Sequence, residues 1–351
     1  MKNEMKAFVI YGKADGKITN VAFPTVGEND VLVKVCYCGI CGTDQDLYSG
    51  ECSFVENGQV TYPLRTGHEW SGIVEDFGAG VKEFKKGDRV VGDNAITCGK
   101  CKACLEKDYP HCEHMLNVGT IDPVYDGAFS EYYVIPFYHL HKIPDYLSLK
   151  AASLAEPLSV AYCGIKKMNI TESSAVAVIG TGCIGLSAAI LAKSLGSKKV
   201  FIVGRNSQKL EVAQKIGVIP VNITQCNPID EIMAQTDNKG ADFVLECSGA
   251  AGTFLQAVEM AAFRAKIALI GFYDKKENGI NVDAMVSKAL TIFGVMGEFD
   301  NMSGVLNLLE KYKPDLLPII TEELPFDDCI KGFNRKNYRN SIKIAVKINE
   351  E

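Results

Sequence analysis

The chain has 351 residues, of which 47% are hydrophobic and 23% charged, as in an ordinary globular protein of two domains. Its net charge of −6 excludes the basic surface that nucleic acid requires, and no apolar run reaches the roughly 18 residues of a membrane span. The N-terminal residues, 1–6, show no signal-peptide pattern. We therefore expect a cytoplasmic protein with neither nucleic acid nor membrane as a partner.

The first 150 residues alternate short apolar segments with glycine-rich turns, which indicates a β-rich and irregular architecture. The strand candidates are residues 7–10, 31–35, 72–75 and 89–91. From Ser148 the pattern becomes helical up to about Lys167. A change of architecture is therefore predicted near residue 150.

Three segments carry residue types that bind metals, two in this part, at 39–44 and 67–72, and one just after it, at 155–159. Taken singly, each is typical of a glycine-rich turn or a helix start. Together they supply one thiolate, one imidazole and two carboxylates, from Cys41, His68, Glu69 and Glu156. This mixture is typical of a catalytic zinc that keeps one exchangeable position.

Thirteen cysteines are many for a reducing compartment, where clustered cysteines indicate metal binding rather than disulfides. Four of them cluster, as Cys98, Cys101, Cys104 and Cys112. Their spacing suits a closed tetrahedral zinc, with an iron–sulfur cluster or a metal-free loop as alternatives. Because four thiolates leave no open position, this zinc should stabilise the fold. Ordinary packing is expected for Cys36, Cys38, Cys163, Cys226 and Cys329.

A regular alternation of strands and helices begins at residue 174. The strand candidates are 174–180, 199–203, 242–246 and 266–270, and the first two helices are 184–195 and 209–216. Such alternation predicts βαβ units and a doubly wound parallel sheet.

A dinucleotide fingerprint lies between the first of these strands and its helix, and consists of Gly180, Thr181, Gly182, Cys183, Ile184 and Gly185. The strand-to-helix context distinguishes it from a coincidental glycine-rich turn. The first glycine should make the tight turn, the second admit the pyrophosphate, and the third pack the helix on the sheet.

The residue that ends the second strand predicts which cofactor is used. NAD sites usually place a carboxylate there to hold the ribose, but this chain has Gly204, followed by Arg205 and, one helical turn later, Lys209. The absence of a carboxylate and the presence of two cations at this position favour the 2′-phosphate of NADP. NAD is the alternative, with Arg205 then an ordinary solvated side chain.

The order and spacing of these segments resemble those of the zinc-containing medium-chain dehydrogenases/reductases over the whole chain. Residues 155–161, AEPLSVA, look like the polyol branch, which includes sorbitol and galactitol-phosphate dehydrogenases. Glu156 stands where ethanol-type enzymes carry cysteine and threonine dehydrogenases usually carry aspartate. The resemblance implies an α/β protein with a β-rich GroES-like catalytic domain at 1–156, a doubly wound Rossmann domain at 157–294 and a return to the catalytic domain at 295–351.

The same resemblance implies two zinc ions per chain and roles for the site residues. Cys41 and His68 would bind the catalytic zinc directly, Glu69 would be a further ligand, and Glu156 a displaceable or outer one. Members of the family differ in which glutamate touches the metal. The implied reaction transfers a hydride between NADP(H) and a polyol, a sugar alcohol or its phosphate, or a related secondary alcohol or ketone, with Thr43 as the acceptor of the alcohol proton.

The chain departs from the family pattern at two places. Asp46 occupies the position of the histidine that commonly relays the proton, so a relay would run through this carboxylate. Residues 294–298 lack the arginine that sorbitol dehydrogenases place after the last strand, so sorbitol itself is not assumed. Tyr48 would either line the substrate pocket or pack in the core.

Two other classes of protein are alternatives to a dehydrogenase. A zinc hydrolase would not need the dinucleotide fingerprint, and a binding protein on this fold would tend to lose the zinc ligands. Residues 290–293 could form an edge strand that pairs across a dimer, and tetramers are common in the branch, so we expect a homo-oligomer.

Overall fold

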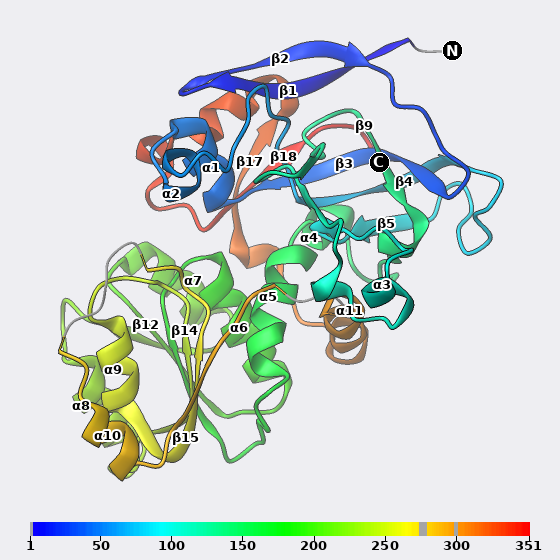
Figure 1. Ribbon diagram of the computed structural model, residues 1–351. Coiled ribbons are helices and arrows are strands. Elements are labelled where there is room, and N and C mark those ends of the chain that lie inside the picture. The colour runs from blue at the N-terminus through cyan, green and yellow to red at the C-terminus, as the bar shows by residue number, and fades with distance from the viewer. Residues whose placement is uncertain (1–2, 274–278, 298–300) are drawn as a thin grey trace. The chain divides into compact units, whose positions relative to one another are not determined.

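The computed structural model describes residues 3–273, 279–297 and 301–351 (Figure 1). The chain divides into two compact units, Met1–Glu156 with Ile320–Glu351, and Pro157–Ile319. The predicted division after residue 156 coincides with the first boundary. The return to the first unit begins at Ile320, not at residue 295 as predicted. Of the residues compared with sorbitol dehydrogenases, Glu298 lies outside the described ranges.

The later return has a packing reason. Helix α11 (Asn301–Tyr312) is followed by the turn η3 (Leu317–Ile319), which contacts helices α6 (Cys183–Ser194) and α7 (Ser207–Lys215) of the second unit. Leu316 and Ile319 are buried there. The apolar face of this segment therefore keeps residues 301–319 on the Rossmann unit.

The first unit is built mainly from antiparallel strands, with two parallel pairs, β17 with β18 and β7 with β8. Its main sheet has the order β10-β5-β4-β3-β18-β17, with β9 also paired to β3, beside a hairpin of β1 with β2 and a small sheet of β6, β7 and β8. The strands are β1 (Glu4–Gly12), β2 (Asp15–Ala22), β3 (Asp30–Ile40), β4 (Glu69–Phe77), β5 (Arg89–Gly92), β6 (Ala95–Ile96), β7 (Leu116–Val118), β8 (Val124–Tyr125), β9 (Tyr132–Pro136), β10 (Leu140–Lys142), β17 (Ile320–Pro325) and β18 (Lys343–Lys347). The predicted strands lie within β1, β3, β4 and β5.

Short helical elements connect these strands. They are α1 (Gly42–Ser49), α2 (Ser53–Glu56), α3 (Lys102–Leu105), η1 (Tyr109–His111), η2 (Phe137–His139), α4 (Leu149–Ala152), η4 (Phe326–Phe333) and η5 (Arg335–Tyr338).

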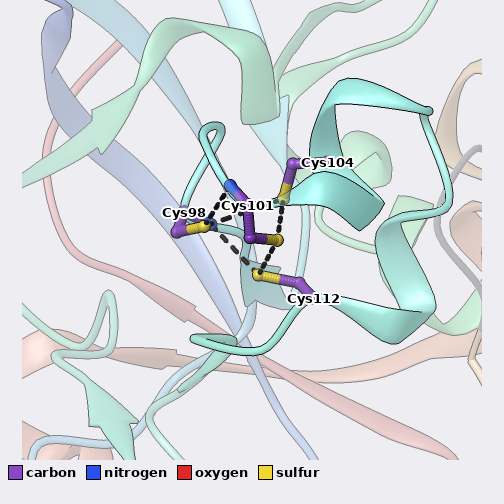
Figure 2. A group of neighbouring side chains, drawn as sticks. All are labelled: Cys98, Cys101, Cys104 and Cys112. Atoms are coloured by element: carbon purple, nitrogen blue, oxygen red, sulfur yellow. Dashed lines mark hydrogen bonds between the residues drawn. The ribbon is translucent and has the colours of Figure 1, made fainter.

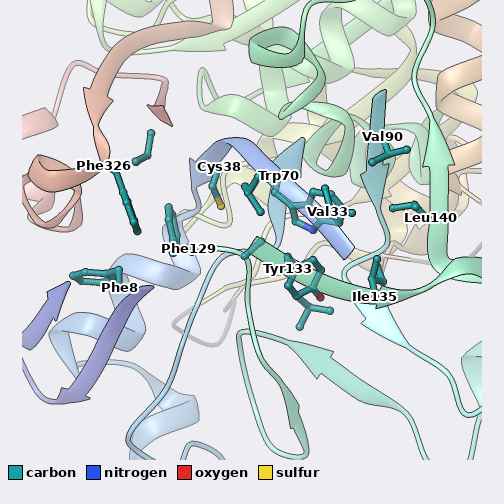
Figure 3. Close-up of a cluster of buried hydrophobic side chains, with 14 of the residues drawn as sticks. Phe8, Val33, Cys38, Trp70, Val90, Phe129, Tyr133, Ile135, Leu140 and Phe326 are labelled. Carbon is teal, nitrogen blue, oxygen red and sulfur yellow. The ribbon is translucent and has the colours of Figure 1, made fainter. Parts of the chain in front are cut away.

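One apolar core supports this unit, with aromatic side chains at its centre (Figure 3). Trp70 and Tyr133 meet edge to face with ring centroids 5.2 Å apart, a geometry that aromatic quadrupoles favour. The strands over this core fix the site, because Gly39 of β3 pairs with Glu69 of β4. That register brings the residue after the end of β3, Cys41, next to the residue before β4, His68.

The second unit is the predicted doubly wound parallel sheet. Its strand order is β13-β12-β11-β14-β15-β16, and every pair is parallel. The remaining elements are α5 (Ala155–Ile165), β11 (Ala175–Ile179), β12 (Lys199–Gly204), β13 (Ile219–Asn222), α8 (Pro228–Gln235), β14 (Ala241–Glu246), α9 (Thr253–Met260), β15 (Ala261–Leu269), α10 (Val282–Ser287) and β16 (Thr291–Gly294). Among the described residues, no helix is both long and apolar enough to cross a bilayer.

Candidate metal centres and cofactor cradle

The four clustered cysteines converge on one point of the first unit (Figure 2). Their sulfur atoms all lie within 4.8 Å of one another, and the Sγ–Sγ distances are 3.5 Å for Cys101–Cys104, 3.9 Å for Cys98–Cys104 and 4.0 Å for Cys101–Cys112. Four sulfurs at 2.3 Å from a tetrahedral ion would be about 3.8 Å apart. The lobe therefore matches the size of a four-thiolate zinc site.

Backbone N–H groups point at these sulfurs and favour thiolates. The N–H of Cys98 donates to Cys112 Sγ at 3.3 Å, and that of Cys101 to Cys98 Sγ at 3.4 Å. Donation from the Lys100 and Cys101 backbone lowers the pKa of the Cys98 thiol to about 6, whereas burial raises that of Cys104 to about 12. A cation at the centre would favour the thiolate form of all four.

The second cluster consists of Cys41, His68 and Glu69, whose ligand atoms also lie within 4.8 Å of one another. These are three of the four ligands predicted from sequence, and the register of β3 with β4 explains how they come together. Glu156 does not join the set at that spacing, but it is buried and close enough to raise the pKa of His68.

Local backbone features place each of these ligands. Asp44 accepts the backbone N–H of Cys41 at 2.8 Å and so caps helix α1 just after the thiol. Gly67 has φ +106°, and a Cβ there would lie 2.7 Å from the backbone nitrogen of Phe129. Glycine at position 67 is therefore required for the backbone conformation that leads into His68.

Asp44 has a second role that the sequence analysis did not assign. It is fully buried, and its Oδ1 lies 3.8 Å from Nδ1 of His68. Neither atom has a hydrogen-bond partner among the described residues. A metal-bound histidine usually donates its other ring N–H to a carboxylate, and Asp44 is in place for this. The C-x-x-D spacing from Cys41 was the available signal.

Glu69 is held by a buried lysine that sequence analysis also missed. Lys343 of β18 donates to Oε2 of Glu69 and, at 3.1 Å, to the carbonyl of Ile40. The side chains of Lys343 and Glu69 are only 4% and 2% exposed. No spacing rule connects the two residues, because they lie 274 positions apart.

Glu156 is held by a side-chain amide. The Nδ2 of Asn94 donates to its Oε1 at 2.5 Å. Burial is the main cause that raises the pKa of Glu156 to about 7, and the nearby Glu69 adds to it, while His68 opposes it.

The remaining predicted catalytic residues lie on helix α1. Thr43 is half-buried in its first turn, two residues after Cys41. Asp46 forms an ion pair with Arg335, with both carboxylate oxygens within 3.0 Å of the guanidinium. Arg335 also donates to the carbonyl of Gly42 at 2.9 Å and so fastens the start of the helix. Tyr48 donates to Ala14 and packs against Phe333, as a core tyrosine would.

The catalytic cluster fits a divalent cation on electrostatic grounds. Burial alone would lower the pKa of His68, but the negative groups of Asp44, Cys41 and Glu156 raise it well above its ordinary value. Although Lys343 pairs with Glu69, the groups that act on His68 are mainly negative, so a cation beside the imidazole would be favoured. The donors, a thiolate, an imidazole and carboxylates, are those that zinc prefers.

The fingerprint residues form the expected turn in the second unit. Gly180 has φ +112° after β11, and Gly182 caps helix α6. A Cβ at Gly185 would overlap the carbonyl of Gly180, whereas one at Gly182 would meet no protein atom within 4 Å. Gly185 thus permits close helix packing, and Gly182 leaves the backbone near Cys183 and Ile184 accessible to a pyrophosphate.

Two cations gather at the N-terminus of helix α7. Arg205 is exposed just after β12, and Lys209 is half-buried in the first turn, where burial lowers its pKa. That turn contains no acidic residue. Cations are unfavourable at this positive end of a helix unless an anion lies between them.

The comparisons with known proteins agree with this arrangement. Residues 27–145 match the alcohol dehydrogenase GroES-like domain, and residues 183–311 match the zinc-binding dehydrogenase domain. L-threonine 3-dehydrogenase of Bacillus velezensis is 32% identical over 95% of this chain and 96% of its own. Sorbitol dehydrogenase of Halalkalibacterium halodurans is 31% identical over 92% and 93%.

A solved structure shows the same fold over the full length. It is a zinc-binding dehydrogenase of Sinorhizobium meliloti bound to NADP, 27% identical, with a TM-score of 0.89 over 99% of this chain and 100% of that one. The chain therefore belongs to the zinc-containing medium-chain dehydrogenases/reductases. It is an oxidoreductase of the alcohol dehydrogenase family, with a GroES-like and a Rossmann domain, as the sequence predicted.

Proposed function

We propose that this protein transfers a hydride between NADP(H) and a polyol, a sugar alcohol or its phosphate, or a related secondary alcohol or ketone. The observation that carries the proposal is the convergence of Cys41, His68 and Glu69. A dinucleotide fingerprint in the same chain favours hydride transfer over other zinc chemistry. We further propose two zinc ions per chain, the second at the four-cysteine lobe.

Different residues of the first unit have different proposed roles in the reaction. Bound zinc would supply Lewis acidity toward the substrate oxygen, and the nicotinamide would give or take the hydride. Cys41 and His68 hold the metal, and Asp44 orients the imidazole. Thr43 accepts the alcohol proton at its hydroxyl oxygen. Asp46 remains our candidate for passing that proton outward, and its ion pair with Arg335 places it near the surface.

The two glutamates have separate supports, which favours separate roles. Glu69 lies within the ligand set, so we propose it as the carboxylate that meets the resting ion. Glu156, which lies outside that set, would be the displaceable or outer carboxylate. A glutamate at position 156 supports the polyol branch over threonine dehydrogenases, which usually carry aspartate there.

The preference for NADP rests on Gly204, Arg205 and Lys209. No carboxylate at residue 204 repels a 2′-phosphate, and the cations at the start of α7 would pair with it. The similar structure from S. meliloti holds NADP. NAD remains the alternative.

Steady-state kinetics with both cofactors test this preference. Arg205→Ala should lower kcat/KM for NADP by about 10- to 150-fold, as for loss of a hydrogen bond to a charged group, and leave NAD nearly unchanged. Lys215→Ala, at the far end of α7, is the control. Arg205→Asp should reverse the preference. An aspartate at 204 is a poorer test, because its Cβ would overlap the methyl group of Thr181. A wild-type preference for NAD would refute the proposal.

The substrate class is tested by a screen over sugar alcohols, sugar phosphates, diols and L-threonine. A kcat/KM that is highest for L-threonine would overturn the polyol assignment. Elemental analysis should give two zinc ions per chain, and one or none would contradict the two-site proposal.

We also propose a homo-oligomer, a dimer or a tetramer. β16, close to the predicted 290–293, is an edge strand of its sheet, and Val286 and Met296 beside it are 72% and 68% exposed. A second copy pairing along β16 would cover this edge. Sedimentation equilibrium that gives a monomer at micromolar concentration would contradict this assembly.

A further inference from the structure

A ribbon formed by strands β6 and β7 of the small three-stranded sheet leads from the four-cysteine lobe to Glu156. Strand β6 pairs with β7, with Ala95 opposite Asn117 and Ile96 opposite Leu116. At the lobe end, the backbone of Cys98 donates to the sulfur of Cys112. At the other end, the N–H of Val118 donates to the carbonyl of Asn94 at 3.0 Å.

Asn94 is the residue at which this ribbon meets the pocket. Its side-chain amide donates to Oε1 of Glu156 at 2.5 Å. An ionised carboxylate can only accept, so the NH2 group of the amide faces it in that form. The bond holds one oxygen of Glu156 at the amide and limits the rotation of the carboxylate.

A buried histidine fixes the backbone on both sides of Asn94. The N–H of Thr97 donates to Nε2 of His139 at 2.9 Å, so this nitrogen is an acceptor. The ring proton is then on Nδ1, which donates to Asp93 at 2.9 Å. The N–H of Asp93 returns to the carbonyl of His139 at 3.0 Å. Residues 93 and 97 are therefore tied to one rigid group.

We infer that Asn94 is a positioning residue for Glu156, and that the ribbon from the four-cysteine lobe keeps Asn94 in place. The inference rests on the proposed catalytic zinc, beside which Glu156 would be the displaceable or outer carboxylate. Zinc bound in the lobe would then have a second consequence besides stabilising the fold. It would help to fix where the Glu156 carboxylate stands relative to Cys41, His68 and Glu69.

Metal binding tests the inference without substrate or dinucleotide, so its failure is distinct from a failure of the proposed reaction. Cobalt(II) is placed in the catalytic site, and its visible spectrum and its affinity against a competing chelator are measured. Asn94→Ala should alter the ligand-field band and weaken binding by about 10- to 100-fold, as for other outer partners of metal ligands. Asn117→Ala is the matched control, because Asn117 lies in the same ribbon but its amide donates to the carbonyl of Ile121 and not to Glu156.

An unchanged spectrum and affinity in Asn94→Ala, or an equal change in Asn117→Ala, would overturn the positioning role. The coupling to the lobe is tested with Cys112→Ser, alone and with Asn94→Ala. The ribbon predicts that the second substitution adds little to the first, whereas additive losses would refute the coupling. If Cys112→Ser does not fold, Cys101→Ser takes its place in the same cycle, with the same two outcomes.

Discussion

The buried ion pair of Lys343 with Glu69 allows a sharp test of how the catalytic cluster is held. Lys343→Met keeps most of the side-chain volume but removes the cation. It leaves the Glu69 carboxylate, 2% exposed, without this partner, and the carbonyl of Ile40 without this donor. Breaking a buried pair on one side costs about 3–5 kcal/mol of folding free energy. We expect a loss of that size in the first unit.

The fluorescence of the single tryptophan of the chain reports the unfolding of the first unit alone, because Trp70 is buried in that unit, directly after Glu69. Its fluorescence is followed in urea with zinc in excess. Lys347→Met is the matched control on the same strand, because Lys347 pairs with Glu350, a side chain that is 87% exposed. Its unfolding curve should stay close to that of the wild type.

Adding Glu69→Gln to Lys343→Met removes the unpaired charge, so part of the lost stability should return. The reasoning would be refuted if Lys343→Met shifted the tryptophan transition no more than Lys347→Met. It would also be refuted if the double variant were the less stable one.

The other predictions concern turnover and metal content. Thr43→Ala should lower kcat by about 100-fold with dinucleotide affinity unchanged, and an intact kcat would place the proton acceptor elsewhere. Cys101→Ser should lower the melting temperature and reduce the zinc content to one ion per chain; retention of both ions would contradict the lobe assignment. Arg335→Ala should lower kcat more than it changes KM, because the start of helix α1 loses its fastening, while the neighbouring Lys336→Ala should leave both near wild type.

The features that sequence predicted well are those whose chemistry is contained in a short stretch. The turn from β11 to α6 needs Gly180 and Gly185 for reasons of backbone geometry that operate within six residues. The four cysteines span fifteen positions, and their spacing alone restricts how they can wrap an ion. The alternation of apolar strands and helices likewise predicted the parallel sheet, because each element shows its own period.

The features that sequence missed depend on pairing between distant strands. From sequence, Lys343 would be assigned to the solvent-facing surface, since lysine is seldom buried without a partner. The pairing of β18 with β3 is what brings it to Glu69. The bond from Asn94 to Glu156 spans 62 positions. The late return at Ile320 was missed because the periodicity of α11 does not tell which unit its apolar face covers.

These distant partners change the meaning of the predicted ligands. The residues named from sequence explain why zinc would bind, but they do not explain how a carboxylate beside it could give way to a substrate oxygen. In the structure each glutamate has a support of its own, a cation for Glu69 and an amide for Glu156. A carboxylate that already has a partner loses less when it leaves the metal, because it does not become an unpaired buried charge. In the proposed site, the exchangeable position would therefore depend as much on Lys343 and Asn94 as on the ligands themselves.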